Sequence, residues 1–223
     1  MQLSRKELAK MMDSTNVKAT ATKSEVEKLC KEAVQYGFKC VVINPVYVKL
    51  AAKMLKGSSV AVCSTVGFPF GTSLSEIKAL EALKAVGDGA EELDMVIDLS
   101  ALKSGDYNTV KQDIAAVVDV KRLSKEIIVK VIIETVYLTR DEKIIACKLA
   151  KEAGADFVKT STGLVGEGAT IEDVRLMRQT VGKDMGVKAA GGIRTYGDAI
   201  AMIGAGANRI GTSRAVAIIE GAP

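Results

Sequence analysis

Three ionisable side chains lie inside apolar runs of this 223-residue sequence. Lys159 is in "DFVKTSTG", Lys188 is in "GVKAAGG" and Asp94 is in "ELDMVID". An ammonium at the end of a buried strand must be paired, solvated or deprotonated. Two lysines on adjacent strands lower each other's pKa, because like charge and desolvation both disfavour the protonated amine. A neutral lysine amine attacks a carbonyl carbon and forms a Schiff base, and a neighbouring carboxylate can move the protons.

Residue types that the chain lacks narrow this chemistry further. It contains no histidine, so acid–base catalysis near neutral pH must use lysine, a carboxylate, cysteine, tyrosine or water. The cysteines, at positions 30, 40, 63 and 147, form no C-x-x-C pair, so we expect reduced thiols, no metal site and no cofactor. Lys159, Lys188 and Asp94 are therefore the predicted catalytic set, and a structural, salt-bridged pair of lysines is the alternative.

Short apolar runs alternate with helical patterns along the whole chain, as in proteins with buried parallel strands. The runs cover residues 10–15, 38–44, 59–65, 90–98, 126–135, 155–162, 186–192 and 208–213. Eight such units in this length predict a single-domain (β/α)8 TIM barrel over residues 1–223. A doubly wound open sheet is the alternative fold, but no G-x-G-x-x-G follows the first run.

Three of the connecting helices have a capping-box spacing at their start. They cover residues 22–37, 73–87 and 139–154, and the second begins with Ser73 and Glu76. Its Ile77, Leu80 and Leu83 repeat at a helical spacing, which predicts a helix with one apolar face.

Such barrels carry their functional groups at the carboxyl ends of the strands, and they often bind phosphate in the last turns. The last three turns contain small residues whose backbone N–H groups can approach an anion. We therefore predict a phosphosugar site. Its candidate binding residues are Asp13, Thr15, Thr160, Gly163, Gly191, Gly192 and Ser213.

The motifs "VKTSTG", "VKAAGGIRT", "ELDMVID", "VIIET" and "RIGTS" together resemble the deoxyribose-phosphate aldolases, over nearly the whole chain. The resemblance implies a (β/α)8 class I aldolase that reversibly cleaves 2-deoxyribose 5-phosphate to glyceraldehyde 3-phosphate and acetaldehyde without a metal. It also implies roles. Lys159 resembles the Schiff-base lysine, Lys188 the second lysine that keeps the first one neutral, and Asp94 the carboxylate of the proton relay.

Four positions depart from the pattern of that family. Ser14 stands where members often have histidine, Val42 where many have cysteine, Leu164 where some have lysine, and Arg214 where a second serine often follows the first. The departures concern phosphate binding and aldehyde tolerance, and the catalytic set is intact. Two alternative functions remain open: a non-catalytic phosphate-binding barrel, and a Schiff-base aldolase or transaldolase for another phosphosugar.

Three further residues invite weighed interpretations. Glu134 ends the fifth run. It is predicted either to orient a catalytic lysine or water, or to form a structural salt bridge. Lys130 lies on the same strand face as Glu134, and we expect it inside the barrel, paired with a carboxylate. Asp98 shares a face with Asp94 but lies further along, and is the weaker relay candidate.

Composition bears on partners and location. The net charge of +4 is dispersed and aromatics are 4% of the chain, which disfavours nucleic-acid binding. No apolar run reaches the ~18–20 residues of a membrane span, and the N-terminus has no apolar secretory core. We expect a cytoplasmic protein with a small phosphosugar substrate that forms a homo-oligomer, either a dimer or a tetramer.

Overall fold

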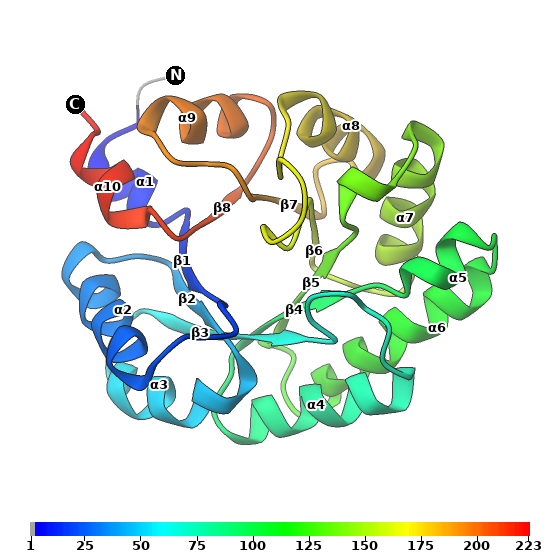
Figure 1. Cartoon of the computed structure of the whole chain (residues 1–223), viewed down its shortest axis with the longest axis horizontal. Coiled ribbons are helices and arrows are strands. Elements are labelled where there is room, and N and C mark those ends of the chain that lie inside the picture. The colour runs from blue at the N-terminus through cyan, green and yellow to red at the C-terminus, as the bar shows by residue number, and fades with distance from the viewer. Residues whose placement is uncertain (1–2) are drawn as a thin grey trace.

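The eight apolar runs form eight parallel strands that close into a barrel in the computed structural model, which describes residues 3–223 (Figure 1). The strands are β1 (Met12–Asn16), β2 (Cys40–Ile43), β3 (Ala61–Val66), β4 (Glu92–Val96), β5 (Ile128–Ile132), β6 (Phe157–Lys159), β7 (Gly186–Ala190) and β8 (Arg209–Thr212). They pair in chain order, and β8 pairs with β1. The predicted (β/α)8 barrel is confirmed, and the open sheet is excluded.

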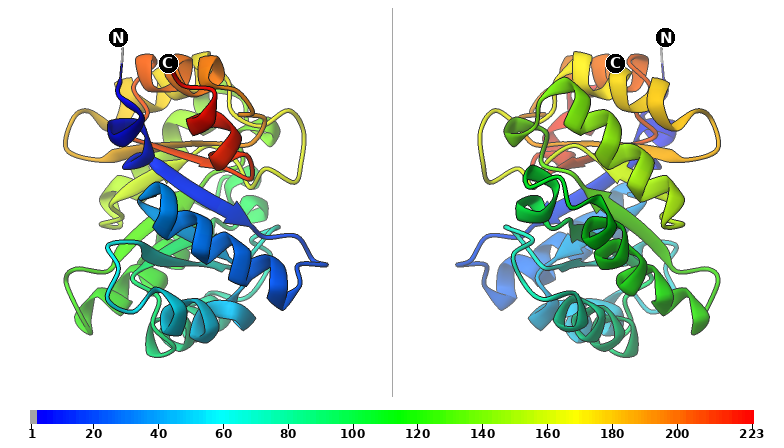
Figure 2. Two further views of the ribbon diagram at one scale, coloured as in Figure 1. Left: turned by 90° about the vertical axis from the view of Figure 1, so that its left-hand side faces the viewer. Right: turned by 90° about the vertical axis from the view of Figure 1, so that its right-hand side faces the viewer.

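Helices surround the barrel and cover its outer face (Figure 2). They are α1 (Arg5–Ala9), α2 (Lys23–Tyr36), α3 (Val48–Leu55), α4 (Ser75–Gly87), α5 (Leu99–Lys103), α6 (Tyr107–Val118), α7 (Arg140–Glu152), α8 (Ile171–Val181), α9 (Tyr196–Gly204) and α10 (Ala215–Glu220). Short 3₁₀ turns cover Pro45–Tyr47, Asp119–Arg122 and Thr135–Tyr137. The first and last helices, α1 and α10, lie side by side, and the Arg5 guanidinium of α1 donates to the Ala222 carbonyl at 2.7 Å (Figure 1). Within the described residues, no helix is both long and apolar enough to cross a bilayer.

Alternation along β4 shows how the strands divide their side chains between two environments. Leu93, Met95 and Ile97 are fully buried in the core between the strands and the helices. Asp94, between them, faces the barrel interior, where it meets charges from other strands. The predicted register of this strand is confirmed. Several apolar runs extend beyond their strands, because the turns after the strands are buried as well: the run 126–135 yields only Ile128–Ile132.

The helix starts follow the capping prediction in two of three cases. Thr22 with Glu25, and Thr139 with Glu142, form complete capping boxes at α2 and α7. The box predicted from Ser73 and Glu76 is wrong, because α4 begins after Leu74, which provides no side-chain cap.

The apolar face of α4 does not pack on the barrel. Ile77, Leu80 and Leu83 are 54%, 62% and 44% exposed, and they point away from the barrel. The face of α4 that packs inward carries small residues, Ala82 and Ala85, together with the fully buried Lys78. The Lys78 ammonium lies 2.7 Å from Asp113 of α6 and 3.0 Å from the Val96 carbonyl. A paired lysine and two alanines therefore pack α4 on the barrel, and the apolar stripe faces outward. Leu74 is 72% exposed beside the same outward stripe.

Candidate active site

The three predicted catalytic side chains meet inside the barrel. Lys159 and Lys188 are register partners on the adjacent strands β6 and β7. Their ammonium nitrogens each lie 2.7 Å from the same oxygen, Asp94 Oδ2, which reaches them from β4. All three side chains are buried. The structure thus brings the predicted set together within hydrogen-bond distance.

Lys159 is the member of this set that is pushed toward its neutral form. Burial is the largest cause and lowers the pKa of Lys159 below its ordinary value; Asp94 opposes that shift, and the Lys188 ammonium adds to it. The amine stands at the end of β6 and forms part of the wall of a cavity. A lowered pKa makes the amine easier to deprotonate, and in its neutral form a lysine amine that faces a cavity is a nucleophile toward a carbonyl group.

Lys188 and Asp94 are held in their charged forms. Burial alone would lower the pKa of Lys188, but Asp13 and Asp94 outweigh it and raise that pKa above its ordinary value. For Asp94, burial raises the pKa, whereas Lys130, Lys159 and Lys188 together hold it well below the usual carboxyl range. The site therefore combines a fixed cation, a fixed anion and a reactive amine.

Four more charged side chains fill the interior next to this set. Lys130 of β5 lies 2.9 Å from Asp94 Oδ1 and 2.6 Å from Glu92 of β4. Arg209 of β8 lies 2.7 Å from Glu92 and 2.6 Å from Asp13 of β1. Asp13 completes the network at 2.6 Å from Lys188. The expectation that Lys130 lies inside the barrel and pairs with a carboxylate is confirmed, but Glu92 and Arg209 were not anticipated.

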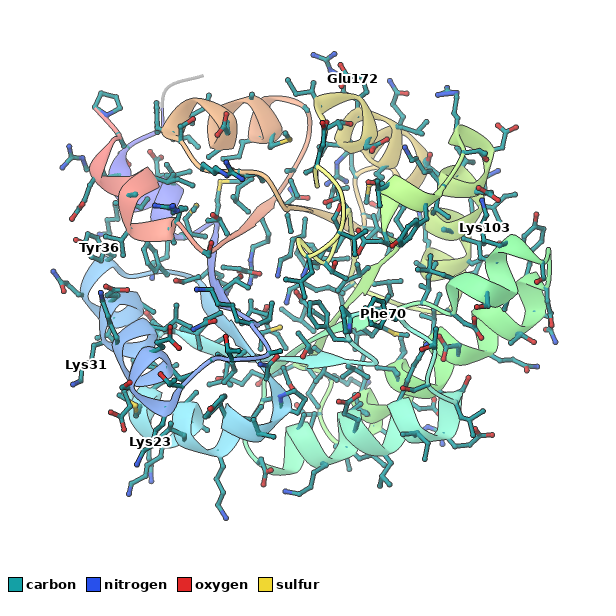
Figure 3. All side chains as sticks on the ribbon, viewed as in Figure 1. Lys23, Lys31, Tyr36, Phe70, Lys103 and Glu172 are labelled. Atoms are coloured by element: carbon teal, nitrogen blue, oxygen red, sulfur yellow. The ribbon has the colours of Figure 1, made fainter. Side chains whose placement is uncertain are left out.

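A cavity of about 700 Å³ opens above this charged layer at the carboxyl ends of the strands. Lys159 is part of its lining, with turn residues from β1, β6, β7 and β8 around it. The predicted binding residues that line it are Thr15, Gly163, Gly191, Gly192 and Ser213. Figure 3 shows Lys31 on the outer side of α2, away from the barrel interior. The cavity belongs to the barrel end where the chemistry of this fold is found.

Glycine is required where two of the lining turns touch. Gly191 has φ 88°, and a Cβ there would lie 2.8 Å from the Gly168 Cα and 3.2 Å from the Gly163 Cα. Gly192, with φ 76°, would place a Cβ 2.5 Å from the Glu167 carbonyl oxygen. Because Gly163, Gly191 and Gly192 have no side chains, they contribute only backbone atoms to the cavity wall.

Two predicted binding residues lie elsewhere. Asp13 is fully buried in the charged layer between Lys188 and Arg209. The Thr160 hydroxyl is fully buried too; it donates to the Ala190 carbonyl and accepts from the Ala190 N–H, both at 3.0 Å, so its bonding capacity is used within the sheet. Thr162, two residues further, lines the cavity instead. Alternation along "KTST" puts Thr162 on the same side as Thr160 and opposite to Lys159, so this pattern gave no signal for it; Thr162 reaches the cavity because the chain has left β6 by then.

Glu134 and Asp98 both support turns near the cavity. Asp98 accepts the Ala101 N–H at 2.9 Å and caps α5, which is a structural task. Glu134 adopts φ 49°, a left-handed conformation that is uncommon outside glycine. Its carboxylate accepts the Thr162 N–H at 3.0 Å. Glu134 therefore holds the turn that carries Thr162 and Gly163 at the cavity wall.

Two of the four departures from the family pattern lie at the cavity. Leu164 and Arg214 line it, in the company of Lys18, Lys28 and Arg194 as well as Glu25 and Glu32. Val42 belongs to a small apolar cluster inside the barrel with Val17, Cys40 and Cys63. Ser14 is buried in β1. The mouth of the cavity is thus mostly cationic, which suits an anionic ligand.

Two cysteines that are distant in sequence come together in the interior. The ligand atoms of Cys40, Cys63 and Glu92 lie within 4.8 Å of one another. The Lys130 ammonium lies 3.4 Å from Cys63 Sγ, and Glu92 already pairs with Lys130 and Arg209. Burial, the largest cause, raises the pKa of the Cys40 thiol well above its ordinary value. A neutral thiol next to two cations is a poor environment for a metal cation.

Comparison with known proteins places this geometry in context. Residues 7–218 match the model of the DeoC/LacD family of aldolases. The chain is 62% identical over 97% of its length to the deoxyribose-phosphate aldolase of Thermococcus gammatolerans, of which it covers 96%. It is 59% identical to that of Thermococcus kodakarensis, with 99% of each chain covered. The tetrameric deoxyribose-phosphate aldolase of Aeropyrum pernix superposes with a TM-score of 0.91 at 37% identity, over 97% of this chain and 91% of that one.

Proposed function

This chain belongs to the DeoC/LacD family of aldolases, and on that basis we propose that it reversibly cleaves 2-deoxy-D-ribose 5-phosphate to D-glyceraldehyde 3-phosphate and acetaldehyde. The observation that carries the proposal is the buried Lys159 amine, which faces the cavity while bonded at 2.7 Å to Asp94. The comparisons support the reaction, and the geometry supports the assignment of roles. We infer that residues 1–223 act as one catalytic domain.

Lys159 is the proposed nucleophile. Its neutral amine attacks the C1 aldehyde carbon of the open-chain sugar, and loss of water from the adduct gives an iminium ion. The C2–C3 bond then breaks: the C3 hydroxyl gives up its proton to form the aldehyde of glyceraldehyde 3-phosphate, and the bonding electrons pass into an enamine at C2. Protonation of C2 and addition of water release acetaldehyde and regenerate the amine.

Asp94 and Lys188 are the proposed partners in these steps. The Asp94 carboxylate lies 2.7 Å from the Lys159 nitrogen, within reach of the proton that the amine loses on attack. Lys188 keeps its charge through Asp13 and Asp94, and disfavours a second positive charge on Lys159. No metal or cofactor has a part in this sequence of steps.

The proposed phosphate position lies over the turns of Gly163, Gly191, Gly192 and Ser213. These turns follow β6, β7 and β8, which are neighbours in the barrel. Arg194 and Arg214 lie at the same part of the cavity wall and bring positive charge. Phosphate binding at this end holds the sugar with its aldehyde toward Lys159, so that remote binding energy contributes to catalysis.

Trapping with borohydride tests the assignment. Incubation with acetaldehyde and sodium borohydride should add a two-carbon group to the protein, and peptide mapping should place it on Lys159. A label confined to Lys188 would reverse the two lysine roles. Cleavage assays with deoxyribose 5-phosphate, and with other phosphosugars, separate this substrate from that of another Schiff-base aldolase or a transaldolase; absence of any turnover would favour a non-catalytic phosphate-binding barrel.

We further propose a homo-oligomer, either a dimer or a tetramer, in which the stripe of Leu74, Ile77, Leu80 and Leu83 on α4 contacts a second copy. Exposed apolar stripes of this kind mark interfaces between proteins, and a relative from Aeropyrum pernix is tetrameric. Leu80→Glu should reduce the mass measured by light scattering.

We also propose a cytoplasmic location, in keeping with four free cysteines.

A further inference from the structure

The buried charges below the cavity form a closed ring. Beginning at Arg209, the ion pairs run to Glu92, Lys130, Asp94, Lys188 and Asp13, and then back to Arg209. Every contact in this ring is between 2.6 and 2.9 Å. Cations and anions alternate, so the six members carry three positive and three negative charges. Each member has two partners of opposite sign, and the ring is neutral by itself.

Lys159 lies outside this ring. Over residues 3–223 its single ion-pair partner is Asp94, and that carboxylate already faces Lys130 and Lys188. A proton on Lys159 would give the closed interior a fourth positive charge against three negative ones. Burial at 3% exposure leaves little water to stabilise that excess charge.

We propose that Lys130 is a positioning residue for the reaction: with Glu92 and Arg209 it closes a neutral ring of charges, so that the Lys159 amine has no carboxylate of its own and stays uncharged. This rests on the proposed role of Lys159 as the nucleophile and goes beyond it. Lys188 alone does not set the charge of the Lys159 amine. The balance of positive and negative charges over the entire ring does. Lys130 is fully buried and is not part of the cavity lining, so it acts through Asp94 and does not touch the substrate.

The groups that bear on the amine come from every strand of the barrel except β6, which carries Lys159 itself. They are Asp13 from β1, Cys40 from β2, Cys63 from β3, Glu92 and Asp94 from β4, Lys130 from β5, Lys188 from β7 and Arg209 from β8, with Glu134 beyond the end of β5. Cys40 keeps its proton, because burial raises the pKa of this thiol. Glu134 is bonded to the Thr162 N–H in the turn above. The ring thus supplies the charges that decide the protonation of Lys159.

The test measures the pH at which Lys159 becomes reactive. Acetaldehyde, which has no ionisable group, is mixed with the enzyme under excess cyanoborohydride, and the rate of labelling at Lys159 is followed by mass spectrometry between about pH 5 and pH 10. Lys130→Met removes one ring cation, so Lys159 becomes the cation that restores neutrality. The acid limb of the profile should move up by about one pKa unit or more, and labelling at pH 7 should fall about tenfold and recover near pH 9.

Removing the matching anion should cancel this effect. Glu92→Gln alone should leave the acid limb in place or move it to lower pH, because it increases the positive excess. In the double variant Glu92→Gln/Lys130→Met the ring residues that remain carry two positive and two negative charges, so they are neutral again and the acid limb should return close to that of the wild type. Lys78→Met is the matched control: it removes a buried ammonium that is paired at 2.7 Å with Asp113, outside the barrel interior, and should leave the limb unchanged.

These outcomes distinguish an effect of the ring on the charge of Lys159 from a purely structural role of its residues. If Lys130→Met only lowers the plateau, or if the double variant keeps the shift of the single one, the ring does not set the charge of Lys159. If Lys130→Met does not fold, Arg209→Gln removes another ring cation and must shift the limb in the same direction. A wild-type enzyme that is never labelled at Lys159 would instead overturn the proposed nucleophile, and the role of the ring with it.

Discussion

Replacing Lys188 with leucine tests the electrostatics of the site most directly. Its ammonium and that of Lys159 are each 2.7 Å from Asp94 Oδ2, so the two nitrogens lie at most about 5.4 Å apart. At an effective dielectric constant of about 20, this separation corresponds to a repulsion of about 3 kcal/mol. That energy equals about two pKa units, by which the pKa of Lys159 should rise in the variant.

The expected result is a displaced pH profile. Because the neutral amine is the reactive form, kcat/KM at pH 7 should fall about 100-fold from this ionisation alone and recover in part above about pH 9. The measurement is the initial rate of deoxyribose 5-phosphate cleavage from pH 5.5 to 10. A thermal melt must accompany it, since removal of one partner from a buried ion pair costs about 3–5 kcal/mol of stability. A folded variant whose acid limb coincides with that of the wild type would refute the electrostatic role.

Three further outcomes are expected. Ser213→Asp places a negative charge at the proposed phosphate position, so kcat/KM for deoxyribose 5-phosphate should drop by at least about tenfold, with a much smaller loss for unphosphorylated deoxyribose; equal losses would locate the phosphate elsewhere. Exhaustive chelation should leave activity intact, and a loss that zinc or magnesium restores would contradict the Schiff-base mechanism. Burial would raise the pKa values of Asp13 and Asp94, but the neighbouring cations outweigh it, so both pKa values are lowered in the fold. The ionised carboxylates therefore stabilise the folded state fully above the ordinary carboxyl pKa of about 4, and this contribution is lost as the pH falls below it. The melting temperature should accordingly be level from pH 7 to 5 and fall below about pH 4, and a flat profile down to pH 3 would argue against the ionised ring.

The sequence was sufficient to predict the barrel and the residues at the ends of its strands. Period-two alternation around Asp94, and the position of Lys159 at the end of an apolar run, determine which side chains enter the interior once the strands close. These are local properties, and the structure places both residues where the pattern predicts them.

The ring could not be predicted in the same way. Glu92 and Arg209 belong to β4 and β8, and their contact depends on the diameter and stagger of the closed barrel, which no local pattern records. The outward orientation of the α4 stripe could not be predicted for a different reason. A helical spacing of Ile77, Leu80 and Leu83 establishes that one face is apolar, but it does not say whether the barrel or another molecule covers that face.

The layered arrangement of the barrel has a consequence for how such an enzyme can diversify. The charged groups around the Lys159 amine, which we propose set its reactivity, are enclosed in the interior, whereas the residues around the cavity mouth, such as Leu164, Arg194 and Arg214, belong to turns after the strands. Substitutions in those turns can reshape the acceptor pocket without disturbing the protonation of Lys159. New aldehyde acceptors are therefore accessible through changes at the mouth alone, and the interior can be inherited unchanged.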